Sequence, residues 1–185
     1  MVTKQSAKDV KSLAGLPGIR HRVSMYAGSS DGDGMWTAVR ENLDNCSDEA
    51  SAGRNKLIGL IRDLSTPNAF WVIDEGEGIP VGNIKLTNPV SGKQETVSAF
   101  KAIVAIPHSG SKFDENANAD GQRGTHGVGI KLTNATSNVF RVHTCYDGQW
   151  YMTEYAKGQV VTEVKKCTAP KHPLTGKPLR KGTMT

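Results

Sequence analysis

Residues 69–80 read AFWVIDEGEGIP, and this stretch is the most informative one for the fold. Its first five residues are apolar, aromatic or β-branched, which predicts a buried strand. The strand leads directly into Asp74-x-Gly76-x-Gly78. A carboxylate at a strand end can accept a hydrogen bond from an exocyclic amine, and glycine lets a ligand approach the backbone closely. An ordinary acidic turn is the alternative that this stretch alone leaves open.

Hairpins are predicted on both sides of this strand. Residues 56–62 form the preceding strand, and residues 65–68 (STPN) supply the turn between the two. Further along, strand-like segments are separated by the pairs Asp147-Gly148 and Lys157-Gly158, which predicts an antiparallel meander. Those segments are residues 139–145, 149–155 and 159–166.

Helical spacing marks three other segments. The longest runs from about Gly34 to Ala52, with Gly53 as its stop. At about 100° per residue, its apolar and polar side chains separate onto opposite faces. The apolar face holds Trp36, Val39, Leu43, Cys46 and Ala50, and the polar face holds Glu41, Asn45 and Asp48. Shorter helices are predicted at about 96–106 and 130–136, whereas residues 16–30 are expected to be a connection and residues 1–15 a polar arm.

Together these elements predict an α+β fold. We expect a two-layer sandwich in which a mixed, largely antiparallel sheet carries helices on one face. Residues 16–185 are expected to form one domain, because a chain of 185 residues buries roughly 70% of its unfolded surface.

Composition narrows the class of protein. No apolar run approaches the roughly 18 residues of a membrane span, and the N-terminus lacks a secretory signal, so no membrane partner is expected. The three cysteines (46, 145 and 167) have no CxxC pairing, which argues against a disulfide framework and a zinc site and makes a cytoplasmic location the expectation. The net charge is +5, and residues 157–181 hold seven basic residues against Glu163 alone. A solvated basic loop is favoured there over a DNA contact.

Two more clusters bear on chemistry. Residues 41–49 read ENLDNCSDE on the long helix, although asparagine and aspartate are poor helix formers; a solvated acidic face is the alternative. Residues 124–129 read GTHGVG ahead of a predicted helix, where free backbone N–H groups can bind phosphate oxygens. Because the P-loop and Rossmann glycine patterns are both absent, a flexible lid within residues 109–129 is the better interpretation.

In this order and at these separations, the three clusters resemble the GHKL (Bergerat) ATPase superfamily. The helix with Asn45 is similar to the family's N-box, residues 74–78 to its adenine-binding motif, and residues 126–129 to its lid glycines. Residues 16–28 (LPGIRHRVSMYAG), 79–82 and 110–114 and the late pair Gly182-Thr183 resemble the gyrase B branch of type II topoisomerases, so that the similarity covers nearly the whole chain.

The resemblance implies roles for the matching residues. Glu41 would be the general base that activates water, and Asn45, one helical turn later, would hold Mg²⁺ bridging the phosphates of ATP. Asp74 would accept the adenine amine. The other residues implied in nucleotide binding are Asp48, Glu49, Gly78, Ile79, Pro80, Lys112, Gly124, His126, Gly127, Val128, Gly129 and Thr183.

The implied function is Mg-ATP binding and hydrolysis that drives dimerisation for DNA strand passage in a type II topoisomerase. The resemblance implies transducer and DNA-gate domains that we expect to lie outside these 185 residues, so that DNA and a cleavage partner would act through other regions. We expect this chain alone to hydrolyse ATP slowly. Glu77, Val23-Ser24 and Thr125 depart from the gyrase pattern and indicate a divergent enzyme, with a viral origin as a guess. A MutL-type repair ATPase and a non-hydrolysing nucleotide-sensing module are the alternatives.

Overall fold

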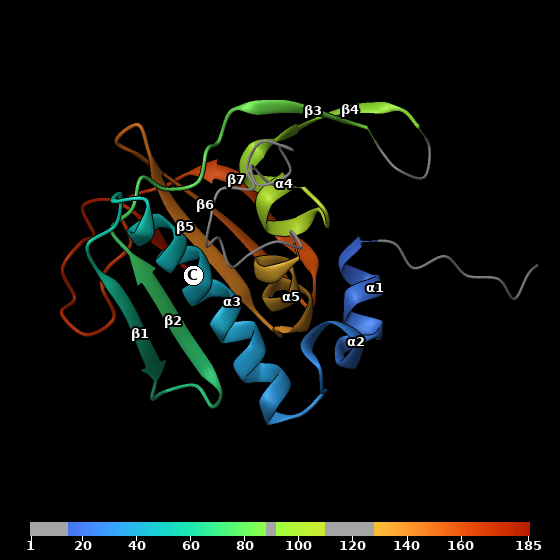
Figure 1. Cartoon of the computed structure of the whole chain (residues 1–185). Coiled ribbons are helices and arrows are strands. Elements are labelled where there is room, and N and C mark those ends of the chain that lie inside the picture. The colour runs from blue at the N-terminus through green and yellow to red at the C-terminus, as the bar shows by residue number, and fades with distance from the viewer. Residues whose placement is uncertain (1–14, 88–91, 110–127) are drawn as a thin grey trace, which may run out of the picture.

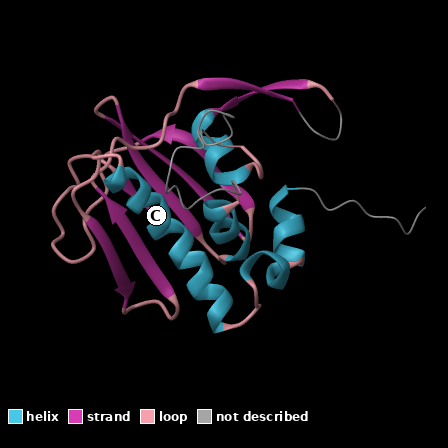
Figure 2. Cartoon of the chain, viewed as in Figure 1, coloured by secondary structure: helices cyan, strands magenta, loops and turns pink. Residues whose placement is uncertain are grey.

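An antiparallel six-stranded sheet forms one layer of the structure, and helices cover one of its faces (Figure 1, Figure 2). The computed structural model describes residues 15–87, 92–109 and 128–185. The sheet has the strand order β1-β2-β8-β5-β6-β7, and a separate two-stranded hairpin, β3-β4, extends from the body. The strands are β1 (Ile58–Asp63), β2 (Ala69–Asp74), β3 (Asn83–Thr87), β4 (Gln94–Ser98), β5 (Phe140–Tyr146), β6 (Gln149–Ala156), β7 (Gln159–Lys166) and β8 (Thr183–Met184). The helices are α1 (Gly15–His21), α2 (Val23–Ala27), α3 (Gly32–Ser51), α4 (Ala99–Ala105) and α5 (Gly129–Thr136).

The predicted hairpins are confirmed, and their turns explain why. Asp147 and Gly148 both have positive φ values, 49° and 72°, and Lys157 and Gly158 repeat the pattern with 53° and 76°. Two successive positive φ values are typical of the hairpin turns whose twist matches that of the flanking strands. The β5-β6-β7 meander follows, with Cys145 opposite Trp150 beside the first turn.

Local hydrogen bonds define both ends of helix α3. The Asp31 carboxylate accepts a hydrogen bond from the Asp33 backbone N–H at 3.1 Å, which caps the helix start. At the other end Gly53 takes a φ of +75° and its N–H donates to the Ala50 carbonyl, so that the predicted stop is confirmed.

The predicted packing face of α3 is right only in part. Val39 and Cys46 are buried, but Trp36 is 51% exposed and meets the Phe70 ring at the sheet edge, with centroids 5.5 Å apart. The buried face is turned toward Ala38 and Asn42, because α5 packs on that side. The Asn42 side chain donates to the Thr133 hydroxyl of α5 at 2.6 Å.

Two other expectations from the sequence are wrong. Residues 16–30 are not a plain connection, because α1 and α2 occupy most of them and bury Leu16 and Ile19. The helix expected from residue 96 begins only at Ala99, since residues 96–98 belong to β4 and pair with β3.

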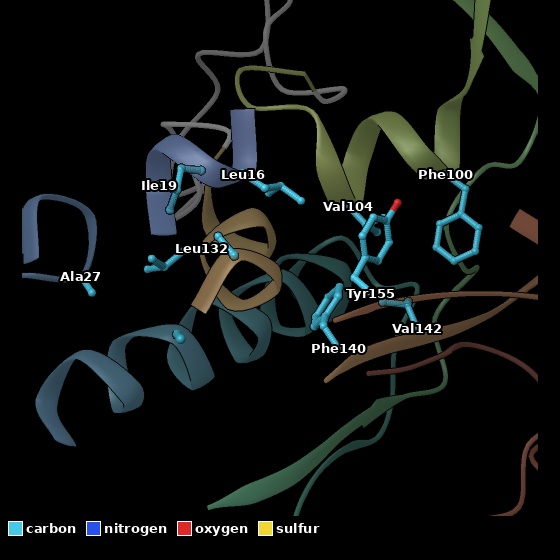
Figure 3. Packing of buried hydrophobic residues seen from close by; sticks show 11 residues of the cluster. Leu16, Ile19, Ala27, Phe100, Val104, Leu132, Phe140, Val142 and Tyr155 are labelled. Atoms are coloured by element: carbon cyan, nitrogen blue, oxygen red, sulfur yellow. The ribbon is translucent and has the colours of Figure 1, made fainter. Parts of the chain in front are cut away.

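The core lies between the sheet and the helices (Figure 3). Its side chains come from all five helices, α1 to α5, on one side and from inward positions of β5 and β6 on the other. The labelled members in the figure are Leu16, Ile19, Ala27, Phe100, Val104, Leu132, Phe140, Val142 and Tyr155. This packing fixes α3 and α5 relative to the end of β2, where the candidate site lies.

The expected arm lies almost wholly outside the described residues, since they begin at Gly15, and so does most of the expected lid. Among the helices that the structure describes, none combines the length and the apolar character that a membrane crossing requires. The basic residues of the loop from 171 to 181 are exposed, as expected for a solvated loop.

Candidate functional site

The carboxylate of Asp74 is held in one orientation at the end of β2. It is only 7% exposed, and its Oδ1 accepts hydrogen bonds from the backbone N–H groups of Gly76 at 2.8 Å and Thr183 at 3.3 Å. The thiol of Cys46 in α3 donates to the other oxygen, Oδ2, with the sulfur 3.6 Å away. Burial raises the pKa of Asp74, and the bonds from Gly76, Cys46 and Thr183 oppose that rise.

The glycines after Asp74 let the loop lie against the neighbouring strands. Gly78 has a φ of +80°, and a Cβ there would overlap the backbone carbonyl of Cys145 in β5. The next residue, Ile79, donates its backbone N–H to the Thr144 hydroxyl at 2.6 Å. Asp74, Thr183 and Thr144 are direct cross-strand neighbours, so that three strands meet at this point.

Asn55 fixes the start of the same loop. It is 5% exposed, its amide donates to the Cys46 carbonyl at 3.1 Å, and its Oδ1 accepts from the backbone N–H of Glu75 at 3.1 Å. One side chain therefore joins the end of α3 to the residue after Asp74. Sequence reasoning missed Asn55 because it follows a helix stop and reads like any turn residue.

Thr144 was missed as well, although the sequence contains a signal for it. It is fully buried at an inward position of β5, between Val142 and Tyr146 in the strand's alternation. A hydroxyl at an inward position needs a partner, which here is the N–H of Ile79.

Glu49 lies next to the glycine loop and is paired with Arg54. The guanidinium of Arg54 donates to both carboxylate oxygens, at 2.9 and 2.7 Å, and its Nε lies 3.9 Å from Glu77. A Cβ at Gly76 would lie 3.5 Å from Glu49 Oε2, which places this carboxylate on the Asp74 side of the helix end. Its charge favours the neutral form of Asp74, whose pKa it raises.

Glu41 lies against the beginning of α5. A Cβ at Gly129 would overlap Oε2 of Glu41 and would lie 3.3 Å from Glu41 Cβ. The first N–H groups of an α-helix have no partner within the helix, and a negative group is favoured beside them. Absence of a side chain at Gly129 is therefore what lets the Glu41 carboxylate reach the α5 N-terminus.

The two ends of the site lie on one helix. Glu41 and Glu49 are eight positions apart in α3, which corresponds to about 12 Å along the helix axis. Asn45 lies midway between them and its side chain is partly exposed.

The remaining predicted residues divide into two groups. Asp48 and Val128 are partly buried, Ile79 packs against the core and Pro80 is exposed. Lys112, Gly124, His126 and Gly127 lie outside the described residues. Among residues 15–87, 92–109 and 128–185, no three His, Cys, Asp or Glu side chains converge to hold a metal ion.

Lys131 is a buried cation in α5 that sequence reasoning did not single out. It is 3% exposed, its ammonium donates to the Ser109 backbone carbonyl, and burial lowers its pKa to about 8. The bond joins the start of α5 to the residues that follow α4.

Known proteins similar to this chain come from bacterial type II topoisomerases. The B subunit of DNA topoisomerase 4 from Rickettsia prowazekii is 37% identical over 170 residues, which are 91% of this chain and 24% of that protein. The B subunit of DNA gyrase from Enterococcus faecalis is 36% identical over 160 residues, or 86% of this chain and 23% of that protein. This chain thus spans about a quarter of the length of these relatives. No protein-family model matches it.

A solved structure agrees with these relatives. The 43K ATPase domain of Thermus thermophilus gyrase B, crystallised with an aminocoumarin, superposes with a TM-score of 0.64 at 28% identity. The match covers 91% of this chain and 37% of that one. By sequence and by fold, this chain is a GHKL ATPase domain of the type II topoisomerase class, related to the B subunits of gyrase and topoisomerase 4.

Proposed function

We propose that this chain binds Mg-ATP and contains the ATP-hydrolysing site of a type II DNA topoisomerase. The observation that carries the proposal is the arrangement along α3. The buried carboxylate of Asp74, whose Oδ1 accepts two backbone N–H groups, contacts Cys46 of α3. Glu41, five positions earlier in α3 or about 7.5 Å along the helix axis, lies against the N-terminus of α5.

The base end would recognise adenine. Oδ2 of Asp74 would accept the exocyclic amine, since both hydrogen bonds from the backbone go to Oδ1. The backbone around Gly78, Ile79 and Pro80 would line the base, because Gly78 keeps that loop close to β5. Thr183 would support the same carboxylate through its backbone N–H.

The phosphate end would carry the chemistry. Glu41 would accept the proton of the attacking water, and Asp48 would support this face of α3. Backbone N–H groups at Val128 and Gly129 would bind phosphate oxygens, as helix N-termini do. The expected contacts from Lys112, Gly124, His126 and Gly127 stay predictions.

A magnesium ion suits this donor set. Mg²⁺ is held in nucleotide sites by one or two protein oxygens together with phosphates and water, rather than by a cage of protein ligands. The amide oxygen of Asn45 is such a donor, and it lies on the same helix face as Glu41, one turn away. The ion would neutralise the charge that develops on the phosphates. This chain's own contribution would be positioning of the nucleotide and of the water.

The rest of the topoisomerase cycle would need more than this chain. Since the relatives are about four times longer, we propose that ATP binding drives dimerisation of the full-length protein, and that DNA passage and cleavage use other domains or subunits. This chain alone would bind ATP more effectively than it turns it over.

Thermal unfolding with a non-hydrolysable ATP analogue and Mg²⁺ tests the binding. Bound ligand raises the free energy of unfolding by RT ln(1 + [L]/Kd), about 2.7 kcal/mol at 100 times Kd. We expect this stabilisation in the wild type and its loss in Asp74→Asn, whose amide cannot replace a carboxylate acceptor at both oxygens. An unchanged response in Asp74→Asn would refute the base site.

Hydrolysis is tested separately. In the full-length protein, Glu41→Ala should retain nucleotide binding and lose turnover by a factor of about 100 to 10,000. The alternative, a non-hydrolysing nucleotide sensor, predicts that even the wild type binds ATP without releasing phosphate. If Glu41→Ala abolished binding, the general-base role would be wrong.

A further inference from the structure

The Cys46 thiol contacts the same oxygen of Asp74 that the proposed function assigns to the base. Cys46 is 5% exposed in α3, and its sulfur lies 3.6 Å from Oδ2. No other hydrogen bond from the described residues reaches Oδ2. The thiol is therefore the one protein donor there within the part of the chain that the structure describes.

An inventory of lone pairs shows what this donor does. A carboxylate has about four lone-pair positions, two on each oxygen. The N–H groups of Gly76 and Thr183 occupy Oδ1, and the thiol occupies one position on Oδ2. One acceptor position is left, on the oxygen that the two backbone donors do not hold.

The thiol donor also affects whether Asp74 is protonated and could itself donate a hydrogen bond. Burial and the charge of Glu49 both raise the pKa of Asp74 and so favour its protonated form, whereas the thiol hydrogen bond favours the carboxylate. A carboxylate accepts only, and a protonated acid can donate to a carbonyl. At the same ring position, an amino group donates a hydrogen bond to this oxygen, whereas a keto group can only accept one from it.

We propose that Cys46 is a positioning residue for base selectivity: by donating to Oδ2, its thiol keeps Asp74 a pure acceptor with one open position, which selects 6-amino purines over 6-oxo purines. The inference rests on the proposed ATP function. It adds that selectivity depends on a side chain of α3 as well as on Asp74 itself.

Side-chain volume at position 46 is the competing explanation for any change in base selectivity. The following variants separate an effect of volume from an effect of the thiol donor. Cys46→Ala removes the donor and leaves a void, whereas Cys46→Val removes the donor and fills the space. Cys46→Ser keeps a hydroxyl donor. Cys145→Ala is a matched control, because that cysteine is equally buried, at 6% exposure, and its thiol makes no hydrogen bond to Asp74.

The experiment uses this chain with Mg²⁺ and titrates two non-hydrolysable triphosphates by calorimetry, one with adenine and one with hypoxanthine. We expect the wild type to prefer adenine, and the ratio of the two dissociation constants to fall about tenfold in both Cys46→Ala and Cys46→Val. Cys46→Ser, which keeps a donor, should retain the wild-type ratio. Cys145→Ala should lower the melting temperature and leave the ratio unchanged.

Three results would overturn the inference. An unchanged ratio in both donor-free variants would show that the thiol does not act on base choice. A ratio that follows side-chain volume, with serine grouped beside alanine, would assign the effect to packing. Absence of nucleotide binding by the wild type would refute the proposed function itself, which is a different outcome from an altered ratio.

Discussion

Asp74 combines two properties that normally conflict, burial and a need for negative charge. Burial raises its pKa, yet the proposed contact with an amine needs the ionised form. Hydrogen bonds from Gly76, Cys46 and Thr183 offset part of the conflict. The residue is therefore expected to lower stability while it enables binding, as is common at functional sites.

The pH dependence of stability should reveal this conflict. Because the folded chain binds the Asp74 proton more tightly than the unfolded chain, where the pKa is near 3.8, this group's contribution to the unfolding free energy falls as pH rises from that value through the raised folded pKa. Above that interval the contribution is constant. Urea unfolding of wild type and Asp74→Asn at several pH values should give a difference, wild type minus variant, that decreases with pH and then levels. A difference that increases with pH would contradict the raised pKa.

Gly129 offers a second test at the scale of one residue. In Gly129→Ala the new methyl group would overlap Oε2 of Glu41 and displace the carboxylate. A displacement of about 1 Å costs up to about 100-fold in rate, so we expect hydrolysis by the full-length protein to fall by about 10- to 100-fold. Phosphate release should be compared with Gly32→Ala, where a Cβ meets open space. Equal rates in the two variants would show that Glu41 tolerates the methyl group.

Sequence reasoning could assign residues whose chemistry is visible in a motif, and it missed those whose role depends on folded neighbours. Asp74 and Glu41 stand in recognisable stretches. Asn55 stands in no recognisable stretch. Cys46 lies within the 41–49 cluster, but its contact with Asp74 was not visible there, because both contacts join positions about twenty to thirty residues apart. No local pattern reports such a contact.

Among the elements, α5 is stabilised at both ends by other parts of the chain. Its N-terminus lies beside Glu41, and at its C-terminus the Arg20 guanidinium of α1 donates to the carbonyls of Ala135, Thr136 and Ser137, the first at 2.8 Å. A cation at a helix C-terminus satisfies carbonyls that lack partners and interacts favourably with the helix dipole.

Arg20→Ala should therefore destabilise the domain. Loss of charge-assisted hydrogen bonds from a partly buried site predicts a decrease of about 1.5 to 3 kcal/mol in the unfolding free energy. Arg22→Ala removes the same charge from an exposed neighbour and should change stability by less than about 0.5 kcal/mol. Chemical denaturation of both variants measures the difference, and equal losses would mean that the α5 carbonyls do not need Arg20.

Elements with strong periodic patterns were predictable, and short or exposed ones were not. The meander was confirmed because its turns carry Asp-Gly and Lys-Gly pairs, and because β5 and β6 bury roughly every second side chain. The β3-β4 hairpin was missed because most of its residues are exposed and polar, so its sequence lacks the alternation of apolar and polar residues that predicts a strand. Helices α1 and α2 are too short for a hydrophobic period, and Pro17 and Gly18 obscure them further.

At the scale of the whole molecule, β8 joins two parts of the sheet that would otherwise be separate. It pairs with β2 on one side and β5 on the other, through Thr183 and Met184. Among the strands that the structure describes, the β1-β2 hairpin and the β5-β6-β7 meander are paired into one sheet through this strand. The strand order could not be predicted from the sequence, because two paired residues carry no readable pattern.

Interrupting β8 should disrupt the domain as a whole. Thr183→Pro removes the N–H that donates to Asp74 and places proline in a central strand, where it is not tolerated. We expect loss of the cooperative thermal transition in circular dichroism, or a destabilisation of at least about 3 kcal/mol. Thr183→Val keeps the N–H and the β-branched shape, so it should fold. A cooperative Thr183→Pro variant of near wild-type stability would show that the two halves associate without β8.

The place of β8 also has a kinetic consequence. The hydrogen bond between Thr183 and Asp74 joins residues 109 positions apart. Contacts between residues so distant along a chain form slowly, because a large loop must close first. The hairpins can form early, but the backbone donor from Thr183 reaches Asp74 only when that loop closes. In a refolding experiment, nucleotide capture should therefore follow the slowest phase and report completed folding, whereas circular dichroism would already register the hairpins.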